Sequence, residues 1–543
     1  MKSMILLGFL MLSSFSLLSQ NQEFNRQDSL RGSITPERAW WDLKYYHLQV
    51  DVDPEEQKIS GSNRILFESM SGNLMQLDLQ PPMLIDQVLF EGKKLRVENE
   101  GNVWYLIFPR LLIEGEIAEV LVDFSGQPRA APNAPWDGGF SWKKDENGQH
   151  FVATSCQGDG SSLWWPCKDH MYDEPDSLML SITTDIGLTA VGNGRLLQID
   201  QDKNGKNTFH WFVQNPINNY GVNINIGDYV QFSEKYEGEK GTLDCAYYVL
   251  KDHLEKAKIH FADVRKMLEA FEHWFGPYPF YEDSYKLVEV PYLGMEHQSS
   301  ITYGNKYQKG YLGRDLSGTG WGEKFDFIII HESGHEWFAN SITYKDIADM
   351  WIHEGFTAYS ENLFVEFHFG KEAGADYVIG TRSGIQNDKP IIGPYDVNKA
   401  GSSDMYYKGA NMLHTLRQLI NDDKQWRKIL RGINETFYHQ VVDTKQIETF
   451  LADKSGLHLQ SFFDQYLRDD RVPILEYRIQ NQTLSYRWSN CVEHFDMPIE
   501  IIHDKEETKL NPTTNWQELK DFSSSILKID RNYYVASLNI LGK

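Results

Sequence analysis

Short runs of apolar residues at strand-like spacing occupy the chain from about residue 35 to 235. Representative runs are YYHLQVDVD at 45–53, VWYLIFP at 103–109 and LMLSITTD at 178–185, and Gly, Asn, Asp and Pro separate such runs. β-Branched and aromatic residues are enriched in strands because they pack well on a pleated surface. The first part of the chain is therefore predicted to be an all-β unit.

The apolar residues change to helical spacing after about residue 250. The stretch DHLEKAKIHFADVRKMLEAFEHWFG, at 252–276, has apolar residues at helical intervals and ends in glycine, which is typical of a helix. Strands return in ILEYRIQNQTLSYRWS at 474–489, so roughly the last 70 residues are predicted to form a small β unit. Further helices are predicted at about 323–340, 350–369, 405–421 and 457–468.

These changes of period divide the chain into parts. A single hydrophobic core stops growing at about 250–300 residues, and this chain has 543. The predicted fold class is therefore multidomain α+β. The expected parts are a leader at 1–20, a β domain at 21–237, a mixed domain at 238–471 and a small β domain at 472–543.

The N-terminal stretch MKSMILLGFLMLSSFSLLSQ has one lysine, an apolar run and then small polar residues. This order is typical of a secretory signal peptide, with cleavage expected near Ser19 or Gln20. A membrane anchor is the alternative, but the apolar run is short and no stop-transfer charges follow it. We therefore predict an exported protein, periplasmic or extracellular, without stable membrane insertion.

The formal net charge of −24 argues against nucleic acid as a partner, because phosphate binding requires basic patches. The four cysteines, Cys156, Cys167, Cys245 and Cys491, are too few for a disulfide scaffold. Export permits a disulfide, and Cys156 and Cys167 are the closest pair in sequence. Buried free thiols are the alternative.

The stretch IIIHESGHEW at 328–337 carries candidate chemistry. On a helix, His331 and His335 lie on one face, so both imidazoles can reach one metal ion. Zinc favours such nitrogen donors. Glu332 is offset around the helix and can hydrogen-bond the metal's water. Two surface histidines on an ordinary helix are the alternative.

A catalytic zinc site needs a third protein ligand and one open position. Glu354 stands near the start of a second amphipathic stretch, DMWIHEGFTAYSENLFVEF, nineteen residues after His335. A helix end, a loop and a new helix fit this gap. The second helix could therefore pack beside the first and turn Glu354 toward the metal.

HESGHEW, followed at this spacing by WIHEGFTAYSE, resembles the M1 family of zinc aminopeptidases, in the gluzincin group. His353 stands where the family commonly has asparagine. The segment VPYLGMEHQSS, at 290–300, resembles the GxMEN exopeptidase motif of the family, with two departures at Leu293 and His297. In the family this segment is an edge strand that pairs with the substrate backbone, and its glutamate, here Glu296, holds the substrate's amine. The substrate-binding residues implied are Gly294, Met295, Glu296 and His297.

Two further segments carry the resemblance. MYYKGANMLHTLR, at 405–417, is similar to the YxKG segment of the family, and Tyr406 matches the tyrosine that donates to the oxyanion. As a neutral donor with a pKa near 10, Tyr406 could serve this purpose. TSCQGDGSSLWWPCKDH, at 154–170, resembles an N-domain segment in which Gln157 falls at a second amine-binding position.

The resemblance covers about residues 35–500 and implies an N-terminal β saddle, a thermolysin-like α/β catalytic domain and a small C-terminal β-sandwich. Larger family members add a C-terminal helical domain, which this chain is expected to lack. The cleft is then either more open or closed by a second subunit; the sequence does not predict the oligomeric state.

The function implied is a zinc-dependent aminopeptidase, with one zinc ion per chain and with free-amine peptides as substrates. Glu332 would act as the general base and Tyr406 as the oxyanion donor. Three alternatives stay open: a thermolysin-like endopeptidase, a non-catalytic binding protein on the same scaffold, and an epoxide hydrolase, an activity of one branch of the family. The GMEH segment speaks against the endopeptidase.

Overall fold

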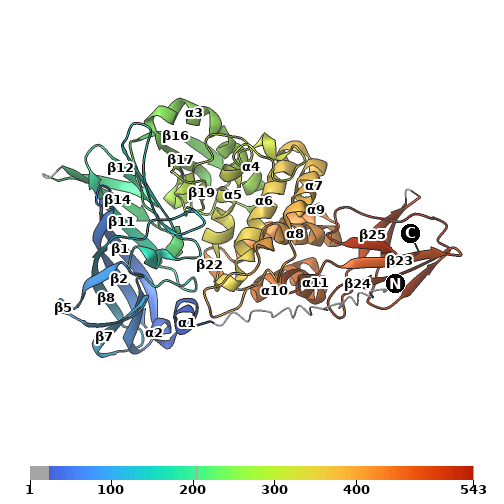
Figure 1. Ribbon diagram of the computed structural model, residues 1–543, viewed down its shortest axis with the longest axis horizontal. Helices are drawn as coiled ribbons and strands as arrows, with labels where there is room; N and C mark the ends of the chain where they lie inside the picture. The colour runs from blue at the N-terminus through green and yellow to red at the C-terminus, as the bar shows by residue number, and fades with distance from the viewer. Residues whose placement is uncertain (1–23, 203–204, 505, 542–543) are drawn as a thin grey trace, which may run out of the picture.

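The computed structural model describes residues 24–202, 205–504 and 506–541. The molecule is elongated, and the parts follow one another along its long axis in chain order (Figure 1). A β-rich N-terminal part lies at one end, helices fill the middle and a small β unit forms the other end (Figure 1). The predicted leader at 1–20 lies outside the described residues.

The N-terminal part is built around an eight-stranded sheet with the order β13-β14-β11-β1-β2-β8-β4-β5. Strand β1 (Trp41–Asp53) lies in the centre, antiparallel to β2 (Lys58–Ser69) and parallel to β11 (Ser177–Asp185). Alternate residues of β1 are buried, as expected for a sheet with one face on a core. The remaining strands are β4 (Leu84–Phe90), β5 (Lys93–Lys94), β8 (Ile117–Gly126), β13 (Arg195–Gln201) and β14 (Lys206–Val213).

Two smaller sheets and two short helices complete this part. The helices are α1 (Arg26–Gly32) and α2 (Pro36–Ala39). One sheet has three strands, β3 (Gly72–Asp78), β7 (Val103–Leu112) and β6 (Arg96–Glu100). The other has four, β12 (Thr189–Val191), β15 (Asn225–Gly227), β10 (His150–Ser155) and β9 (Gly139–Lys144).

A five-stranded sheet joins the N-terminal part to the helices, in the order β16-β17-β18-β20-β19. One hydrophobic core, mainly of the N-terminal part, extends to Val288 and Met295 of this sheet. The short strand β19 is at the sheet's edge and pairs only with β20 among the described residues. The strands are β16 (Tyr229–Gly238), β17 (Gly241–Leu250), β18 (Tyr285–Glu289), β19 (Gly294–Met295) and β20 (Ile301–Tyr303).

Helices α5 (Phe327–Gly334) and α6 (Trp351–Phe369) pack against each other in the middle of the molecule. Most of their side chains are buried. The surrounding helices are α3 (Leu254–His260), α4 (Ala262–Phe275), α7 (Lys371–Gly380), α8 (Tyr407–Ile420), α9 (Asp423–Thr436), α10 (Thr444–Ser455) and α11 (Gln460–Leu467). A two-stranded sheet pairs β21 (Ile342–Tyr344) with β22 (Gln440–Val442).

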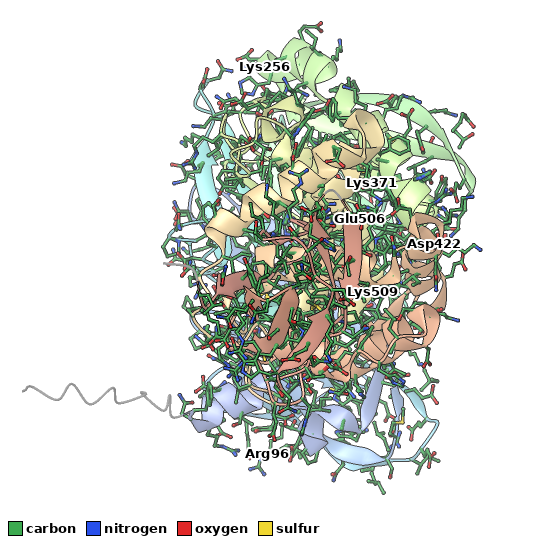
Figure 2. All side chains as sticks on the ribbon, turned by 90° about the vertical axis from the view of Figure 1, so that its right-hand side faces the viewer. Arg96, Lys256, Lys371, Asp422, Glu506 and Lys509 are labelled. Carbon is green, nitrogen blue, oxygen red and sulfur yellow. The ribbon has the colours of Figure 1, made fainter. Side chains whose placement is uncertain are left out.

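The C-terminal unit contains two small sheets whose core is continuous with that of the helices. Tyr466 of α11 donates to the Tyr534 carbonyl at 2.9 Å. Charged side chains such as Glu506 and Lys509 lie on this end of the molecule (Figure 2). The sheets are β27 (Gln517–Lys520), β24 (Thr483–Ser489), β23 (Ile474–Gln480) and β29 (Ala536–Asn539), and β26 (Glu506–Leu510), β25 (Ile499–His503) and β28 (Lys528–Ile529).

The mixed α+β organisation in several sheets agrees with the predicted fold class. All four cysteines are free thiols. Across the described residues, none of the helices is both long and apolar enough to span a bilayer.

Candidate metal centre and substrate cavity

Helix α5 is held at its N-terminus by Asp326, whose side chain caps the backbone N–H of Ile329 at 3.2 Å. The hydroxyl of Tyr303 donates to the same carboxylate at 2.8 Å, and His260 Nε2 lies 2.6 Å from it. The apolar run that follows the cap is buried. Capping and burial together fix the position of this helix, which carries His331 and is followed directly by His335.

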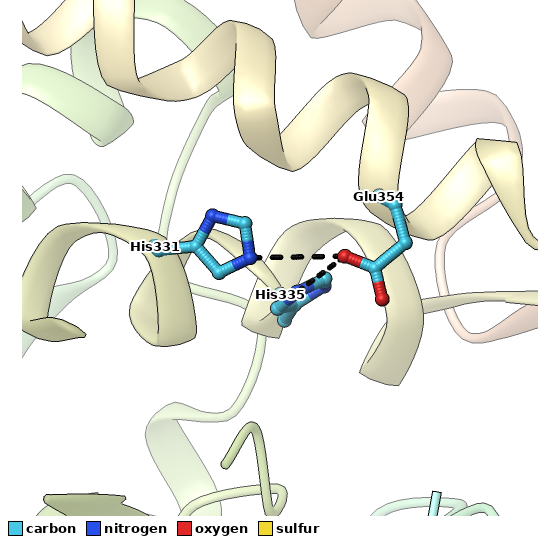
Figure 3. A group of neighbouring side chains, drawn as sticks. All are labelled: His331, His335 and Glu354. Carbon is cyan, nitrogen blue, oxygen red and sulfur yellow. Dashed lines mark ion pairs between the residues drawn. The ribbon is translucent and has the colours of Figure 1, made fainter. Parts of the chain in front are cut away.

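His331 and His335 point their Nε2 atoms at one carboxylate oxygen, Oε2 of Glu354 (Figure 3). The distances from this oxygen are 3.7 Å to His331 and 3.3 Å to His335. One donor atom from each of the three residues lies within 4.8 Å of the others. The structure thus brings the three predicted zinc ligands together, from helix α5, the residue that follows it and helix α6.

Hydrogen bonds on the far side of each imidazole fix which nitrogen faces the cluster. His331 Nδ1 lies 2.8 Å from Glu361 Oε1, whose other oxygen accepts from the Tyr377 hydroxyl at 2.7 Å. His335 Nδ1 lies 3.0 Å from the Phe338 carbonyl. These acceptors fix which nitrogen faces the cluster, and each Nε2 can offer a lone pair to a metal ion when its imidazole is neutral.

The electrostatics of this cluster favour a positive charge among its three side chains. Burial lowers the pKa of His335, but the carboxylates of Glu354 and Glu296 outweigh this effect and raise the pKa to about 9. Burial alone raises the pKa of Glu354, but the two imidazoles outweigh it and lower the pKa. Oε2 of Glu354 is buried and lacks a hydrogen-bond partner among the described residues. Two imidazoles and one carboxylate, which has an oxygen without a hydrogen-bond partner among the described residues, fit the donor set of a catalytic zinc ion.

Glu332 lies beside the edge strand β19. Burial raises the pKa of its carboxyl group to about 7, although the neighbouring imidazoles lower it. A Cβ atom at position 294 would lie 2.5 Å from Ile328 Cγ2 and 3.3 Å from Glu332 Cγ. Gly294 therefore allows the edge strand to lie close against helix α5 and its glutamate.

Glu296 is buried, and its carboxylate accepts two hydrogen bonds from the N-terminal part of the chain. Gln157 Nε2 donates to Oε1 of Glu296 at 2.7 Å and to Oε1 of Glu354 at 3.0 Å. The Tyr220 hydroxyl donates to Oε1 of Glu296 at 3.1 Å. Burial raises the pKa of Glu296, while His335 lowers it. A cation that took the place of one of these donors would therefore be attracted by the buried carboxylate of Glu296.

His353 lies next to the Tyr220 hydroxyl that donates to Glu296. Its Nε2 accepts from the backbone N–H of Tyr344 at 2.9 Å, which leaves the proton on Nδ1. Nδ1 lies 3.5 Å from the Tyr220 hydroxyl, the same hydroxyl that donates to Glu296. No role for His353, Tyr220 or Glu361 was predicted from the sequence. Glu361 had a readable signal, because it follows Glu354 by seven residues and so lies on the same helical face.

Tyr406 lies just before helix α8, with its ring centroid 6.0 Å from that of His331 and the two rings at 21°. Desolvation in the cavity, with the charges of Glu354 and Glu296, raises the pKa of its phenol well above 10. The pKa is thus higher than the ordinary value expected from the sequence. The hydroxyl stays protonated and can donate a hydrogen bond.

These groups line a cavity of about 550 Å³. The predicted residues on its wall are Gln157, Gly294, Met295, Glu296, His331, Glu332, His335, Glu354 and Tyr406. His297 does not line it. This side chain is buried, with Nδ1 3.3 Å from Thr302 Oγ1, and burial lowers its pKa to about 3. The geometry thus indicates that His297 packs in the interior, whereas the family resemblance implied contact with substrate.

Comparison with known proteins shows which proteins this chain resembles. Residues 260–466 match the peptidase family M1 domain. Leukotriene A-4 hydrolase from Xenopus laevis is 24% identical over 453 residues, which are 77% of this chain and 68% of that protein. A probable aminopeptidase 1 from Sulfurisphaera tokodaii is 20% identical over 465 residues, which are 81% of this chain and 54% of that protein.

Solved structures give the same fold. An M1 zinc metallopeptidase from Deinococcus radiodurans has a TM-score of 0.68 at 20% identity, over 80% of this chain and 96% of that one. A mutant of that enzyme bound to a Tyr-Ser-Ala substrate has a TM-score of 0.67 at 20% identity, with the same coverage. Residues 260–466 thus carry a peptidase family M1 domain, and the fold resembles that of M1 zinc metallopeptidases. The chain spans about half the length of archaeal aminopeptidase relatives.

Proposed function

We propose that this protein is a zinc-dependent aminopeptidase that removes the N-terminal residue from peptides, with one zinc ion per chain. One observation carries the proposal: the buried carboxylate of Glu296 adjoins the catalytic cluster. Donor atoms of Glu296, Glu332 and His335 all lie within 4.8 Å of one another. A group that binds an amine therefore stands about one residue away from the group that would act on the first peptide bond.

His331, His335 and Glu354 would hold the zinc ion. The buried, unpartnered Oε2 of Glu354 and the two Nε2 lone pairs support this assignment. When bound, zinc supplies Lewis acidity to the scissile carbonyl and lowers the pKa of water to about 7. Glu361 and the Phe338 carbonyl keep the imidazoles in the tautomer that such binding requires.

Glu332 would act as the general base. Its carboxylate takes a proton from the attacking water and later delivers it to the leaving amine, which are two roles of one group in sequence. Burial, which raises its pKa to about 7, suits both steps at neutral pH. The Tyr406 hydroxyl, kept protonated by its raised pKa, would donate to the oxyanion that develops on the carbonyl.

Glu296 would select the free N-terminus. A peptide's α-amine has a pKa of about 7.7–8.0 and is largely charged at neutral pH. At about 4 Å, a carboxylate attracts such a charge by roughly 4 kcal/mol near a protein surface. An internal segment of a peptide would leave the buried Glu296 without this partner, which is unfavourable. Gln157 and Tyr220 would orient the carboxylate toward the amine.

The types and boundaries of the domains are part of the same proposal. We infer a β saddle at 21–237, a thermolysin-like domain at 238–471 and a small β-sandwich at 472–543. The sheet orders support a division into these parts, with strand β16 pairing with β17 of the middle part across the first boundary. Export, by a leader at 1–20 to the periplasm or the outside of the cell, is also a proposal, supported by the sequence of that segment.

The test is a pair of rate measurements on purified protein. One substrate is a leucyl chromogenic amide with a free amine, and the other is its N-acetylated twin, each with and without a zinc chelator. The proposal expects cleavage of the free-amine substrate only, and loss of that cleavage with the chelator. Cleavage of the blocked twin would instead indicate an endopeptidase.

A variant tests whether Glu296 is responsible for the selectivity for a free amine. Glu296→Ala should weaken cleavage of the free-amine substrate, while Glu493→Ala, on the exposed surface, should leave it unchanged. Equal zinc content in both variants excludes a damaged metal site. Because one relative is named leukotriene A-4 hydrolase, a lipid epoxide joins the substrate panel.

A further inference from the structure

A second cavity, of about 640 Å³, adjoins the substrate cavity. Leu293 and Trp136 line both cavities, so the two are neighbours with a shared wall. The side chain of Trp136 is 61% exposed, which is unusual for so large an apolar group. Aromatic rings from Tyr292, Tyr303 and Tyr307 form much of the remaining wall. The proposed reaction gives this second cavity no role.

The positions of Glu296 and Glu332 indicate on which side of the cleaved peptide bond the second cavity lies. Glu296 marks the position of the substrate's amine. Gly294 precedes Glu296 by two residues in the chain, and Glu332 lies beside Gly294. The edge strand β19 has one side without a strand partner among the described residues, where an extended peptide can pair. A peptide that starts at Glu296 and is cleaved beside Gly294 therefore continues toward Leu293, the residue that leads into the second cavity.

The charged side chains on the wall of the second cavity indicate which kind of ligand it would bind. Its buried carboxylate, Glu289, is already satisfied by His253 at 2.6 Å, the Tyr307 hydroxyl at 2.8 Å and the backbone N–H of Leu250 at 2.9 Å. The oxygens of this carboxylate are therefore already hydrogen-bonded within the protein.

Two lysines on this wall remain available. Lys256 and Lys306 are exposed, and neither forms an ion pair with a carboxylate within the described ranges. The ammonium of Lys256 lies 5.3 Å from the ring centroid of Tyr307. Glu146, also exposed, is the remaining carboxylate on the wall. Two ammonium groups without an ion pair among the described residues thus face one exposed carboxylate on this wall, in a chain whose net charge is −24.

We propose that the second cavity binds the part of a peptide substrate that lies downstream of the cleaved bond, and that Lys256 and Lys306 attract the C-terminal carboxylate of short peptides. This proposal rests on the proposed aminopeptidase function. The tyrosine rings and Trp136 supply contact area for the intervening residues. Short free-acid peptides are the class of substrate that such a site favours over amides of the same sequence.

The experiment compares two substrates that differ only at the C-terminus. A leucyl tripeptide with a free carboxylate and its C-terminal amide are assayed separately, and the ratio of their kcat/KM values is the readout. In the double variant Lys256→Met, Lys306→Met this ratio should fall about threefold to tenfold, the range expected for two exposed charge pairs. Added salt should reduce the ratio for the wild-type protein.

Two further variants sharpen the result. Lys258→Met removes an exposed lysine of the same helix, α3, that pairs with Glu255 and does not line the cavity, so it should leave the ratio unchanged. Replacing Lys256 and Lys306 by glutamate should lower the ratio further than methionine does. A ratio that stays the same in the methionine and glutamate variants would overturn the proposal.

A leucyl chromogenic amide, which has no residues downstream of the cleaved bond, separates this proposal from the one on which it rests. If the wild-type protein cleaves neither this compound nor the tripeptides, the aminopeptidase function itself fails. If the wild-type protein cleaves all of them and the ratio does not respond to the two lysines, only the inference about the second cavity fails.

Discussion

The amide nitrogen of Gln157 lies 2.7 Å from a carboxylate oxygen of Glu296. Gln157 follows strand β10 of the N-terminal part, whereas Glu296 follows the edge strand β19 of the five-stranded sheet. The same amide donates to Glu354 at 3.0 Å. The N-terminal part thus contributes directly to the wall of the substrate cavity, and the site is completed where two parts of the fold meet.

Removing this amide should weaken the hold on the substrate's amine. A hydrogen bond to a charged group contributes about 1.5–3 kcal/mol, so Gln157→Ala should lower kcat/KM for a free-amine substrate by about 10-fold to 100-fold. Gln149→Ala, on the exposed surface before strand β10, is the matched control. Steady-state kinetics on a leucyl amide measures both. An unchanged kcat/KM in Gln157→Ala would remove this residue from the proposed amine site.

Glu361 should control zinc affinity without binding the metal. Its carboxylate holds the proton on His331 Nδ1, at 2.8 Å. Glu361→Gln keeps the size of the side chain but presents a weaker partner, so zinc affinity should fall about 10-fold to 100-fold. Competition with a chelator of known affinity measures it. Glu435→Gln, exposed on α9, should bind zinc like the wild type, and equal affinity in both variants would contradict the role of Glu361.

Tyr406 should act on the rate of the chemical step rather than on binding. Loss of one oxyanion donor typically reduces kcat by about 10² to 10³. Tyr406→Phe should therefore lower kcat by this amount and change KM little. Tyr407→Phe is the natural comparison, because Tyr407 also lines the cavity and could be the donor instead. If Tyr407→Phe shows the larger loss in kcat, the assignment moves to Tyr407.

The pH dependence of kcat/KM should have two limbs. Glu332 must be deprotonated to accept a proton, so activity falls as the pH drops through its pKa, about 7 before a metal's charge is counted. A bound zinc ion lowers this pKa, so the acid limb should lie at or below about pH 7. The alkaline limb should follow the substrate's amine, whose pKa is about 7.7–8.0, because only the charged amine is attracted to Glu296.

Glu296→Ala makes this assignment of the limbs testable. The variant should lose the alkaline limb that belongs to the substrate's amine and keep the acid limb that belongs to Glu332. A profile measured from about pH 5 to 9 on the free-amine amide shows both. An acid limb that lies well above pH 7, or an alkaline limb that survives in Glu296→Ala, would contradict the two roles.

Local patterns in the sequence located the three candidate zinc ligands. The i, i+4 spacing places His331 and His335 on one face of a helix, and Glu354 follows on a second helical pattern. Helices α7, α9 and α10 were not predicted. For α9 the pattern was present, since Trp426, Ile429, Leu430 and Ile433 have helical spacing, but polar residues separate these few apolar ones.

The amine side of the site depends on contacts between distant segments. Gln157 and Tyr220 meet Glu296 across 139 and 76 residues of sequence, and no periodicity encodes such a meeting. The resemblance to the M1 family supplied Gln157 and marked His353 only as a departure from the family's asparagine, and nothing in the sequence marked Tyr220. The edge strand β19 has two residues, too few for a pattern, and its place is set by pairing with β20.

The most direct test of the account follows the products of one peptide over time by mass spectrometry. A peptide with a free N-terminus and its N-acetylated twin are incubated with zinc-loaded protein, with Glu332→Gln as the inactive comparison. The account predicts a ladder of products, each shorter by one N-terminal residue, from the free peptide only. Internal fragments, or cleavage of the acetylated twin, would contradict it.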